Sequence, residues 1–465
     1  MTRAKSYFFC GIGGSGMLPL AMIVHARGHQ VAGSDRSLDQ GRIGAKFRFL
    51  EDQGIPLFPQ DGSGVTSADQ ILVTSAAIEE NVPDVVAARE VGAARITRPQ
   101  LLAQLFNEAE TGIAVGGTSG KSTVTGMIGW ILHAVGRDPT VMNGAVMKNF
   151  ATPDAPFASA LAGQGGAFVS EVDESDGSIA LYRPNVAVLT NITLDHKSME
   201  ELRSLFLGFL AATGTAVLNR DDPETTELAA ALPDEKVLTY SLTEAGADLY
   251  ATNIREAPLA ISFDVTLNET RETVHVALQV PGRHNASNAL AAMAAVYAAG
   301  ETLSDIAHAL SGFQGLKRRF DIVGTKNEVS VIDDFGHNPD KIAATLATLH
   351  AFPGRLLLLF QPHGYGPLKV MGDALIETFS TAMKPSDLLV MPDPVYFGGT
   401  VDRSVGSAEI VAGINARGGK AEHVADRAEA GRRLAALAKP GDRIVVMGAR
   451  DDTLPAFAAD ILASL

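Results

Sequence analysis

The stretch "GTSGKST", residues 117–123, has the composition of a loop that binds phosphate groups. In the common form of this loop, four residues separate the first glycine from the Gly-Lys pair. Counting back from Gly120 places Val115 where that glycine is expected, and Gly116 and Gly117 are the nearest glycines. The loop is therefore shorter than the common form, and its neighbours must decide whether it binds a nucleotide.

The residues on either side of this loop favour a nucleotide site. "TGIAV" (111–115) predicts a buried strand, and the apolar residues after the loop recur at steps of three and four, which predicts a helix. A helix start offers backbone N–H groups and the positive end of its dipole to a phosphate. Lys121 would neutralise phosphate charge, and Ser122 would offer a hydroxyl to Mg²⁺. An ordinary helix-capping turn is the alternative.

Composition limits the class of protein. The chain has 465 residues, which suggests about three domains at roughly 100–200 residues each. Its net charge is −15, with 38 basic and 53 acidic residues. This balance argues against a general affinity for nucleic acid or anionic lipid, although a local basic pocket for a nucleotide remains compatible with it.

The cysteine content and the apolar runs indicate where the protein works. Cys10 is the single cysteine, so no intrachain disulfide can form, as is typical of a reducing compartment. The apolar run at the N-terminus is too short for a signal peptide. The longest aliphatic run, "LLLLF" (356–360), is far below the about 18 residues of a membrane span. We expect a soluble cytoplasmic protein.

Strand and helix patterns alternate in three blocks, which predicts an α/β fold. We place a Rossmann-like domain at residues 1–107, a central phosphate-loop domain at 108–317 and a second Rossmann-like domain at 318–465. Residues 237–280 alternate apolar and polar residues over short runs, so they predict a small antiparallel appendage to a parallel central sheet.

A second glycine-rich turn, "GIGGSG" (11–16), follows the first predicted strand, and Asp35 comes nineteen residues after Gly16. This arrangement is close to a dinucleotide fingerprint, so an NAD-dependent oxidoreductase is one hypothesis. The same turn can hold any diphosphate. Two phosphate sites in separate domains favour an enzyme that joins a nucleotide-diphosphate substrate to ATP chemistry.

Acidic residues follow a predicted strand in "FVSEVDESDG" (168–177). Glu171 ends that strand, where ligand sites collect in open α/β sheets, and it is a natural Mg²⁺ ligand. Asp173, Glu174 and Asp176 are alternatives, and a solvated acidic loop is the non-functional interpretation.

Two further motifs carry polar residues next to predicted elements. "TNITLDHK" (190–197) places Asp195 and His196 after a strand, and "PGRHNASN" (281–288) places His284 and Asn285 at a helix start. Asn285 is expected to cap the helix or to contact a base edge with its amide.

Taken together, these motifs resemble the Mur ligase family, which builds the peptide stem of peptidoglycan. The motifs stand in that family's order: GIGGSGM, GTSGKST, SEVDESDG, TNITLDH, PGRHNASN, KRRF, DDFGHNP and QPHGY. They run from residue 11 to residue 365, and G-T-x-G-K-[ST] is the family's version of the loop. Within the family, the chain is most similar to the branch that attaches L-alanine to UDP-N-acetylmuramate. A branch that attaches a recycled tripeptide shares several of these motifs.

The resemblance implies a role for each motif. The implied ATP contacts are Gly117, Thr118, Ser119, Gly120, Lys121, Ser122, Thr123, His284, Asn285, Arg319 and Asp334. Mg²⁺ would be held by Ser122, Glu171 and His196, and Lys121, Glu171 and His196 would serve catalysis. The UDP-sugar site would comprise Gly11, Gly13, Gly14, Ser15, Gly16, Asp35 and Ser75, and the amino-acid region His337, His363 and Tyr365.

The chain also departs from that branch. Ser119 and Asn338 stand where it usually has histidine, and Gly364 stands where it usually has arginine. Loss of a planar, bidentate cation at position 364 would change how an incoming carboxylate is held. Later-acting members carry a carbamylated lysine that is absent here, since position 211 is Ala211.

We therefore predict an ATP- and Mg²⁺-dependent ligase that joins an amino acid, L-alanine in first place, to UDP-N-acetylmuramate through an acyl phosphate. The alternatives are a ligase for a recycled peptide or another amino acid, an NAD-dependent oxidoreductase, and an inactive nucleotide-binding partner protein. We expect no nucleic-acid or membrane partner, and a monomer or weak homodimer.

Overall fold

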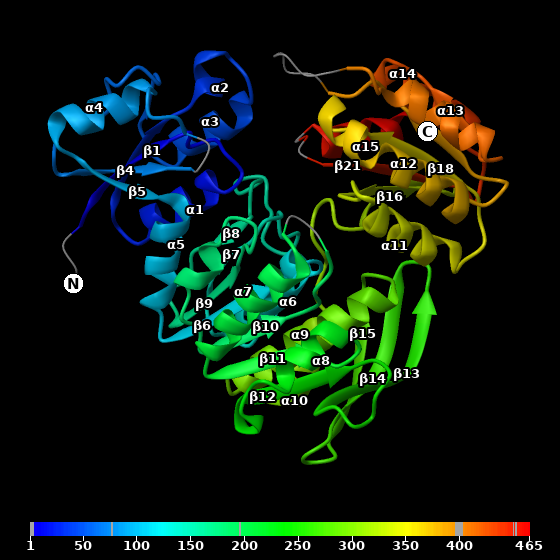
Figure 1. Cartoon of the computed structure of the whole chain (residues 1–465), viewed down its shortest axis with the longest axis horizontal. Coiled ribbons are helices and arrows are strands. Elements are labelled where there is room, and N and C mark those ends of the chain that lie inside the picture. Colours follow the sequence, from blue (N-terminus) through cyan, green and yellow to red (C-terminus); the bar gives the residue numbers. More distant parts are fainter. Residues whose placement is uncertain (1–3, 76–77, 195–196, 396–402, 450, 452) are drawn as a thin grey trace. The chain divides into compact units, whose positions relative to one another are not determined.

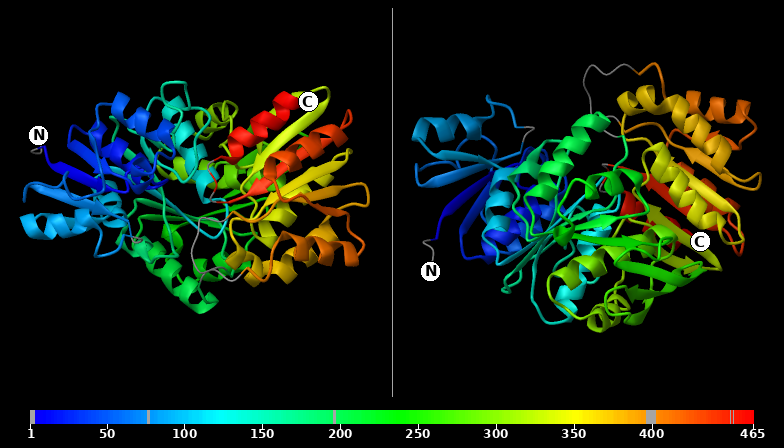
Figure 2. Two further views of the ribbon diagram at one scale, coloured as in Figure 1. Left: turned by 90° about the horizontal axis from the view of Figure 1, so that it is seen from above. Right: turned by 60° about the horizontal axis from the view of Figure 1, so that its bottom comes forward.

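The computed structural model describes residues 4–75, 78–194, 197–395, 403–449, 451 and 453–465. It divides into two compact units, which are described separately. The first comprises Met1–Arg255, Ser262–Gln279 and His284–Gln314, and the second comprises Glu256–Ile261, Val280–Arg283 and Gly315–Leu465. Figure 1 colours both along the chain, and Figure 2 gives two further views.

A five-stranded parallel sheet opens the first unit, in the order β3-β2-β1-β4-β5. Its strands are β1 (Ser6–Cys10), β2 (Gln30–Ser34), β3 (Leu57–Phe58), β4 (Gln70–Thr74) and β5 (Ala94–Thr97). Its helices are α1 (Met17–Ala26), α2 (Arg36–Asp39), α3 (Gly44–Asp52), α4 (Pro83–Val91) and α5 (Arg98–Asn107). Phe8 packs toward α4 and Phe9 toward α1, because successive side chains of a strand point to opposite faces.

The central sheet has ten strands in the order β15-β14-β13-β12-β11-β10-β6-β9-β7-β8. They are β6 (Thr111–Gly116), β7 (Thr140–Met142), β8 (Ala160–Leu161), β9 (Ala167–Glu171), β10 (Val186–Leu189), β11 (Thr215–Asn219), β12 (Val237–Ser241), β13 (Leu249–Ala257), β14 (Ala260–Leu267) and β15 (Thr273–Leu278). The accompanying helices are α6 (Lys121–Ala134), α7 (Met199–Ala211), α8 (Pro223–Ala229), α9 (Arg283–Ala298) and α10 (Leu303–Leu310), with short 3₁₀ turns at Ser178–Leu181 and Asp234–Lys236.

The predicted antiparallel appendage begins later than its sequence pattern indicates. β12 pairs in parallel with β11 and with β13, so it extends the central sheet. β13 and β14 are neighbours joined by a two-residue turn, a connection that only antiparallel strands allow.

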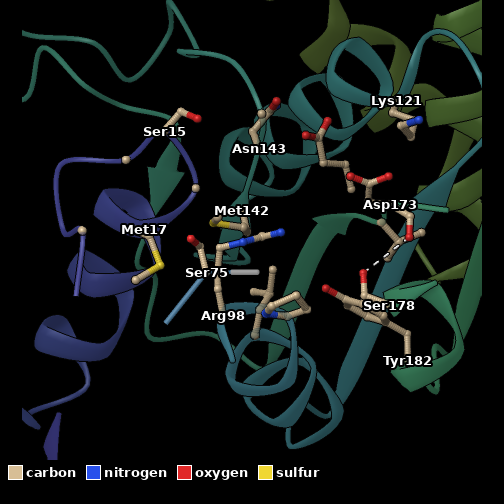
Figure 3. A pocket seen from close by; sticks show the side chains of 18 residues that line it. Ser15, Met17, Ser75, Arg98, Lys121, Met142, Asn143, Asp173, Ser178 and Tyr182 are labelled. Carbon is tan, nitrogen blue, oxygen red and sulfur yellow. Dashed lines mark hydrogen bonds between the residues drawn. The ribbon is translucent and has the colours of Figure 1, made fainter. Parts of the chain in front are cut away.

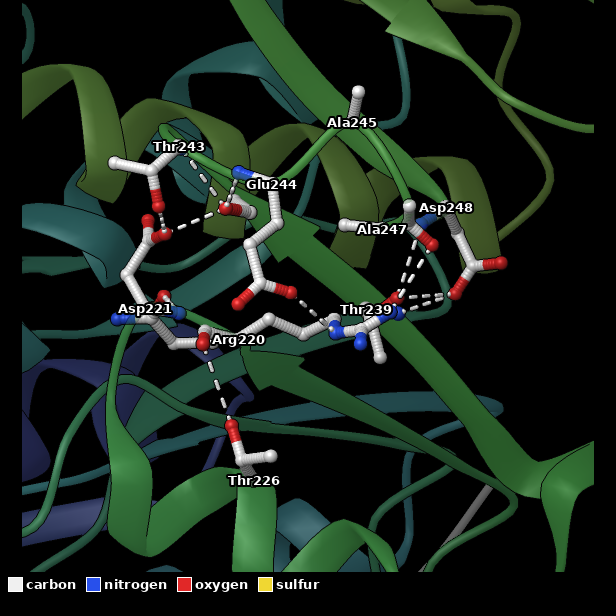
Figure 4. Close-up of polar contacts among 12 residues, drawn as sticks. Arg220, Asp221, Thr226, Thr239, Thr243, Glu244, Ala245, Ala247 and Asp248 are labelled. Carbon is white, nitrogen blue, oxygen red and sulfur yellow. Dashed lines mark hydrogen bonds and ion pairs between the residues drawn. The ribbon is translucent and has the colours of Figure 1, made fainter.

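Polar contacts hold the segments on either side of β12 (Figure 4). The Asp221 carboxylate accepts hydrogen bonds from the Ser241 and Thr243 hydroxyls at 2.5 and 2.6 Å, and Asp248 accepts from the N–H and hydroxyl of Thr239 at 2.7 and 2.6 Å. These bonds anchor the turns that flank β12.

The two sheets of the first unit share one hydrophobic core. The ring of Phe106, from α5, lies 5.6 Å from that of Phe168 on β9, and both are buried. On α6, the indole N–H of Trp130 donates to the Ala309 carbonyl oxygen at 2.7 Å. The shared core explains why the first two blocks of the sequence form a single unit.

The second unit contains a six-stranded sheet in the order β16-β17-β21-β18-β19-β20. Its strands are β16 (Asp321–Lys326), β17 (Val329–Asp334), β18 (Leu356–Gln361), β19 (Leu388–Met391), β20 (Ala421–His423) and β21 (Arg443–Gly448). The β16–β17 pair is antiparallel and the other pairs are parallel. The helices are α11 (Pro339–His350), α12 (Tyr365–Ala382), α13 (Ser407–Ala416), α14 (Arg427–Leu437) and α15 (Leu454–Ser464).

β6 matches the strand expected from "TGIAV", β9 matches the strand expected to end at Glu171, and the α/β class is confirmed. The short strands β7, β8 and β20 have too few residues for a clear pattern and were not foreseen. Among the described residues, no helix is long and apolar enough to cross a membrane.

Candidate functional site

The loop at 117–123 connects β6 to α6 in a conformation that requires its glycines. Gly117 has φ +125°, and a Cβ there would lie 2.2 Å from the Thr190 hydroxyl oxygen. Gly120 has φ +90°, and a Cβ there would lie 2.5 Å from Oδ1 of Asn288. L-residues rarely adopt such angles, so the spacing of the two glycines fixes the shape of the loop.

The "TNIT" stretch after β10 anchors this loop. The Ser119 carbonyl oxygen accepts hydrogen bonds from the Thr190 hydroxyl at 2.6 Å and from Nδ2 of Asn191 at 3.0 Å. The N–H of Ser119 donates to Oδ1 of Asn191 at 3.0 Å, and that of Thr118 donates to the Asn191 carbonyl oxygen, also at 3.0 Å. This anchoring role of Thr190 and Asn191 was missed at the sequence level, where only Asp195 and His196 of the motif were considered.

Two side chains from the start of α6 meet acidic residues that follow β9. Nζ of Lys121 donates to the Gly117 carbonyl oxygen at 2.6 Å and lies 3.1 and 3.3 Å from the Glu174 carboxylate oxygens. The Ser122 hydroxyl donates to Oε2 of Glu171 at 2.8 Å. The structure thus brings the loop and the acidic motif together, as the position of Glu171 at a strand end indicates.

The Ser122–Glu171 pair has the chemistry that Mg²⁺ prefers, since both groups offer oxygen atoms. Gly144 leaves room for the carboxylate, because a Cβ there would lie 2.0 Å from Oε1 of Glu171. The part of the chain that the structure describes contains no cluster of three or more His, Cys, Asp or Glu side chains suited to a metal ion. The predicted third ligand, His196, lies outside the described residues, as does Asp195.

A cavity of about 460 Å³ joins the two glycine-rich turns within the first unit (Figure 3). Ser15 and Met17 line one side of it, across from Lys121 and Asp173. Its other lining residues are Gly11, Gly14, Gly16, Ser75, Arg98, Pro99, Leu102, Met142, Asn143, Gly144, Glu171, Val172, Ser178 and Tyr182. Five of the residues predicted for the UDP-sugar, Gly11, Gly14, Ser15, Gly16 and Ser75, therefore face the same space as Lys121 and Glu171.

Arg98 contributes a positive charge to this cavity and was not predicted from the sequence. It is the first residue of α5, directly after β5, and it lies 4.0 Å from the Asp176 carboxylate. A Cβ on Gly16 would lie 3.2 Å from its Cδ. The sequence did contain a signal for Arg98, since it directly follows a strand, and a strand-end position is the criterion that identified Glu171.

Burial, hydrogen bonds and nearby charges shift the pKa values of two groups in the cavity, Asp173 and Tyr182. Burial raises the pKa of Asp173, but hydrogen bonds from Ser175 and the charges of Lys121 and Arg98 outweigh burial, so the pKa is lowered. Burial raises the pKa of the Tyr182 phenol well above its usual value. At neutral pH the cavity therefore presents an ionised Asp173 and a neutral Tyr182.

Asp35 holds the first glycine turn in place. Its Oδ2 accepts from the N–H of Gly13 at 2.8 Å, and its Oδ1 accepts from the N–H of Ser37 at 2.7 Å, which caps α2. The N–H groups of Gly11 and Ile12 donate to the Ser34 carbonyl oxygen at 2.8 and 2.9 Å. Gly13 and Asp35 do not line the cavity, and a direct contact between Asp35 and a UDP group remains a prediction.

The start of α9 lies beside the phosphate loop through Asn288 and Gly120. Asn285 is buried and accepts a hydrogen bond from Nδ2 of Asn288 at 3.3 Å, while His284 is exposed. The PGRHNASN motif is therefore placed next to the loop, and its contact with adenine remains a prediction.

The remaining predicted residues belong to the second unit. Asp334 accepts hydrogen bonds from the N–H groups of Phe320 and Gly336 and from the Thr345 hydroxyl, at 2.8, 2.9 and 2.9 Å. The Arg319 guanidinium lies 4.3 Å from the centre of the Phe335 ring.

The rings of His337 and His363 lie 5.8 Å apart, and Tyr365 begins α12. The structure therefore brings two members of the predicted amino-acid region together. The approach of Arg319 and Asp334 to a nucleotide stays a prediction.

Comparison with known proteins agrees with this architecture. Three family models match: "Mur ligase family, catalytic domain" at residues 6–110, "Mur ligase middle domain" at 115–296 and "Mur ligase, glutamate ligase domain" at 318–450. The chain is 35% identical over 460 residues to the UDP-N-acetylmuramate–L-alanine ligase of Agrobacterium fabrum, covering 96% of this chain and 94% of the relative. It is 36% identical to that of Mesorhizobium japonicum, with coverages of 97% and 96%.

Among solved structures, the UDP-N-acetylmuramate-alanine ligase of Thermotoga maritima matches with a TM-score of 0.77 and 24% identity over 98% of each chain. A murein peptide ligase from Psychrobacter arcticus matches with a TM-score of 0.71 and 25% identity, covering 99% of this chain and 98% of that chain. The chain belongs to the Mur ligase family, and it has that family's three-domain architecture. The domain boundaries given above remain predictions.

Proposed function

We propose that this protein is an ATP-dependent ligase that joins L-alanine to the carboxylate of UDP-N-acetylmuramate during synthesis of peptidoglycan precursors. The observation that carries the proposal is the continuous cavity that extends from the glycine turn at 11–16 to Lys121 of the phosphate loop and Glu171 at the end of β9. The similarity to L-alanine ligases over nearly the whole chain supports the choice of substrates. We further propose a cytoplasmic monomer or weak homodimer.

The reaction needs activation because a carboxylate is a poor electrophile toward an amine. A carboxylate oxygen of the sugar attacks the γ-phosphorus of ATP, and the bond to the β,γ-bridging oxygen breaks, giving an acyl phosphate and ADP. The amine nitrogen then attacks the acyl carbon and loses a proton, and inorganic phosphate leaves. The ligase holds the reacting groups in one cavity, which lowers the entropic cost of their meeting.

Charge accumulates on phosphoryl oxygens during the first step. Lys121 and the N–H groups at the start of α6 are the groups placed to stabilise it. Ser122 and Glu171, with His196 as the predicted third member, would hold Mg²⁺. When bound, Mg²⁺ neutralises phosphate charge.

Arg98 is the residue we assign to the sugar nucleotide. Among the described residues that line the cavity, it and Lys121 are the two basic ones, and it lies beside Gly16 of the first turn. A guanidinium can bind a diphosphate or a carboxylate through two hydrogen bonds. The assignment explains how a chain with net charge −15 binds an anionic substrate.

The amine is the substrate least constrained by the described residues. Gly364 caps α12 with φ +150°, and among the described residues a Cβ there would meet only Pro367 Cδ within 4 Å, at 3.6 Å. The position thus offers open space where the family pattern places arginine. This feature favours a recycled peptide, or another amino acid, as the second hypothesis.

The test is release of ADP from ATP in the presence of UDP-N-acetylmuramate and single amines: L-alanine, other L-amino acids, glycine and L-alanyl peptides. We expect release that requires both the sugar nucleotide and L-alanine. Strict dependence on a peptide would select the second hypothesis, and no release with any amine would contradict ligase activity.

A variant ties the activity to the loop. We expect Lys121→Ala to lower turnover by about a thousandfold, because the phosphoryl charge loses its cation. The matched control is Lys420→Ala, which removes an exposed lysine of the second unit and should leave turnover unchanged. Near-normal turnover in the Lys121 variant would contradict the assignment.

A further inference from the structure

Lys121 is already fully engaged by the protein in this structure. Its ammonium group has three hydrogens and three acceptors: the Gly117 carbonyl oxygen and both oxygens of Glu174. The exposed fractions of the two side chains are 22% for Lys121 and 7% for Glu174, so the ion pair is largely shielded from water. A shielded pair is screened by salt much less than a surface pair.

A phosphate can therefore reach the lysine only by replacing one of these acceptors. The Gly117 oxygen belongs to the main chain of the loop, whose shape is fixed by Gly117, Gly120 and the Asn191 contacts. The Glu174 side chain is the acceptor that can be exchanged.

The exchange has an electrostatic cost. Glu174 would be left as a shielded carboxylate without its cation, close to Asp173 in sequence and to the phosphates that have taken Lys121. A buried charge that loses its partner is strongly unfavourable.

A divalent cation carried in with the nucleotide changes this balance. It brings two positive charges toward the Ser122–Glu171 end of the loop, where Oε2 of Glu171 and the Ser122 hydroxyl offer oxygen atoms. The added positive charge offsets both the phosphates and the released carboxylate. A metal-free nucleotide brings only negative charge.

We propose that Glu174 is a specificity-determining residue that makes the loop select the magnesium-loaded nucleotide over the free nucleotide, by competing with phosphate for Lys121. The inference rests on the proposed function, since it takes the loop at 117–123 as the ATP site. Glu174 discriminates between the two forms of one substrate, whereas Glu171 is assigned to the metal itself.

The experiment is calorimetric titration of the full-length protein with a non-hydrolysable ATP analogue, once with excess Mg²⁺ and once with EDTA. For Glu174→Gln, we expect the free analogue to bind about tenfold more tightly than to the wild type, because its competitor has lost its charge. We expect the Kd of the magnesium form to change by less than about threefold. The ratio of the Kd of the free analogue to the Kd of the magnesium-loaded analogue therefore falls.

Glu200→Gln is the control, since it neutralises an exposed carboxylate of the same unit, in the first turn of α7, that belongs to none of the predicted sites. Its ratio should equal that of the wild type. If Glu174→Gln weakens both forms equally, Glu174 only shapes the loop, and the proposal is overturned. An unchanged ratio overturns it as well.

Two outcomes separate this inference from the proposed function. A wild-type protein that binds neither form contradicts the ATP site itself. Binding of both forms with an unaltered ratio in the variant contradicts only the role of Glu174. If the Gln variant fails to fold, Glu174→Asp, which withdraws the charge from Lys121, must lower the ratio, and an unaltered ratio there is equally decisive.

Discussion

The imidazole of His337 is held in the second unit as a neutral group. Its Nδ1 lies 2.9 Å from the Phe335 carbonyl oxygen, so Nδ1 carries the hydrogen of this bond. Burial lowers the pKa of His337 to about 4; the hydrogen bond to Phe335 acts against this shift, and electrostatic interactions with Lys341, His363 and Arg319 add to it.

This pKa predicts an acid-sensitive contribution to stability. Between pH 6.5 and 4 the unfolded chain binds a proton at His337 that the folded chain does not, so the free energy of unfolding falls as the pH falls. We expect a loss of up to about 3 kcal/mol between pH 7.5 and pH 4.5, absent in His337→Asn, whose amide can still donate to Phe335. Urea unfolding of both proteins at both pH values measures it, and equal pH dependence would contradict the assignment.

Single residues also show what the sequence could and could not predict. Lys121, Ser122 and Glu171 were predicted because each stands at a strand end or helix start, which the local pattern reveals. Arg98 also stands directly after a strand, but its approach to Gly16 joins residues far apart in the sequence, which no local pattern shows. Glu174 was considered only as an alternative to Glu171, because its ion pair with Lys121 is likewise a long-range contact. His196 lies outside the described residues, and its role stays a prediction.

At the scale of elements, the β7–β9 pair positions Glu171. The two strands run in parallel with Met142 opposite Ser170, so the segment after β7 passes beside the end of β9. Gly144 is the residue of that segment whose missing side chain leaves room for the carboxylate.

We expect Gly144→Ala to displace Glu171, because the new Cβ would lie 2.0 Å from Oε1. Overpacking of this kind costs about 1–3 kcal/mol, so the Mg²⁺ concentration for half-maximal turnover should rise by about tenfold. Gly208→Ala, on α7, is the control, since no described residue lies within 4 Å of its added Cβ. An unchanged Mg²⁺ titration in the Gly144 variant would remove Glu171 from the metal site.

The elements that escaped prediction have physical reasons. β12 alternates apolar and polar residues, which is typical of an antiparallel strand, yet it pairs in parallel on both sides. Its polar partners explain this, because Asp221 and Asp248 satisfy hydroxyl groups that would otherwise need water. Alternation of apolar and polar residues shows that one face of a strand is polar. It does not show whether the strand pairs in parallel or antiparallel with its neighbours.

At the scale of the whole molecule, the first two sequence blocks form one unit, which block-by-block patterns could not show. Their common core depends on contacts such as that of Phe106, on helix α5 of the first block, with Phe168, on strand β9 of the central sheet. The sequence predicted the class, the number of domains and the motif order, since these depend on local patterns and on the family resemblance.

The chain's single thiol allows a test of the N-terminal sheet in the intact protein. Cys10 is buried at the end of β1, and burial, with the nearby Asp84, raises its pKa to about 12. At pH 8 we expect Ellman's reagent to modify the folded protein at least about a hundredfold more slowly than the unfolded chain.

UDP-N-acetylmuramate should slow this modification further, because Cys10 directly precedes Gly11 of the cavity. ATP alone should have a smaller effect. Rapid modification of the folded protein would contradict the burial of Cys10.

The position of Trp130 allows nucleotide binding to be followed by tryptophan fluorescence. It is the only tryptophan of the chain, and it lies on α6, the helix that starts at the phosphate loop, with its N–H fixed to Ala309. The tryptophan emission of the unlabelled protein therefore originates from the helix that we propose receives the nucleotide. Stopped-flow mixing can time the arrival of ATP through this indole without any dye or tag.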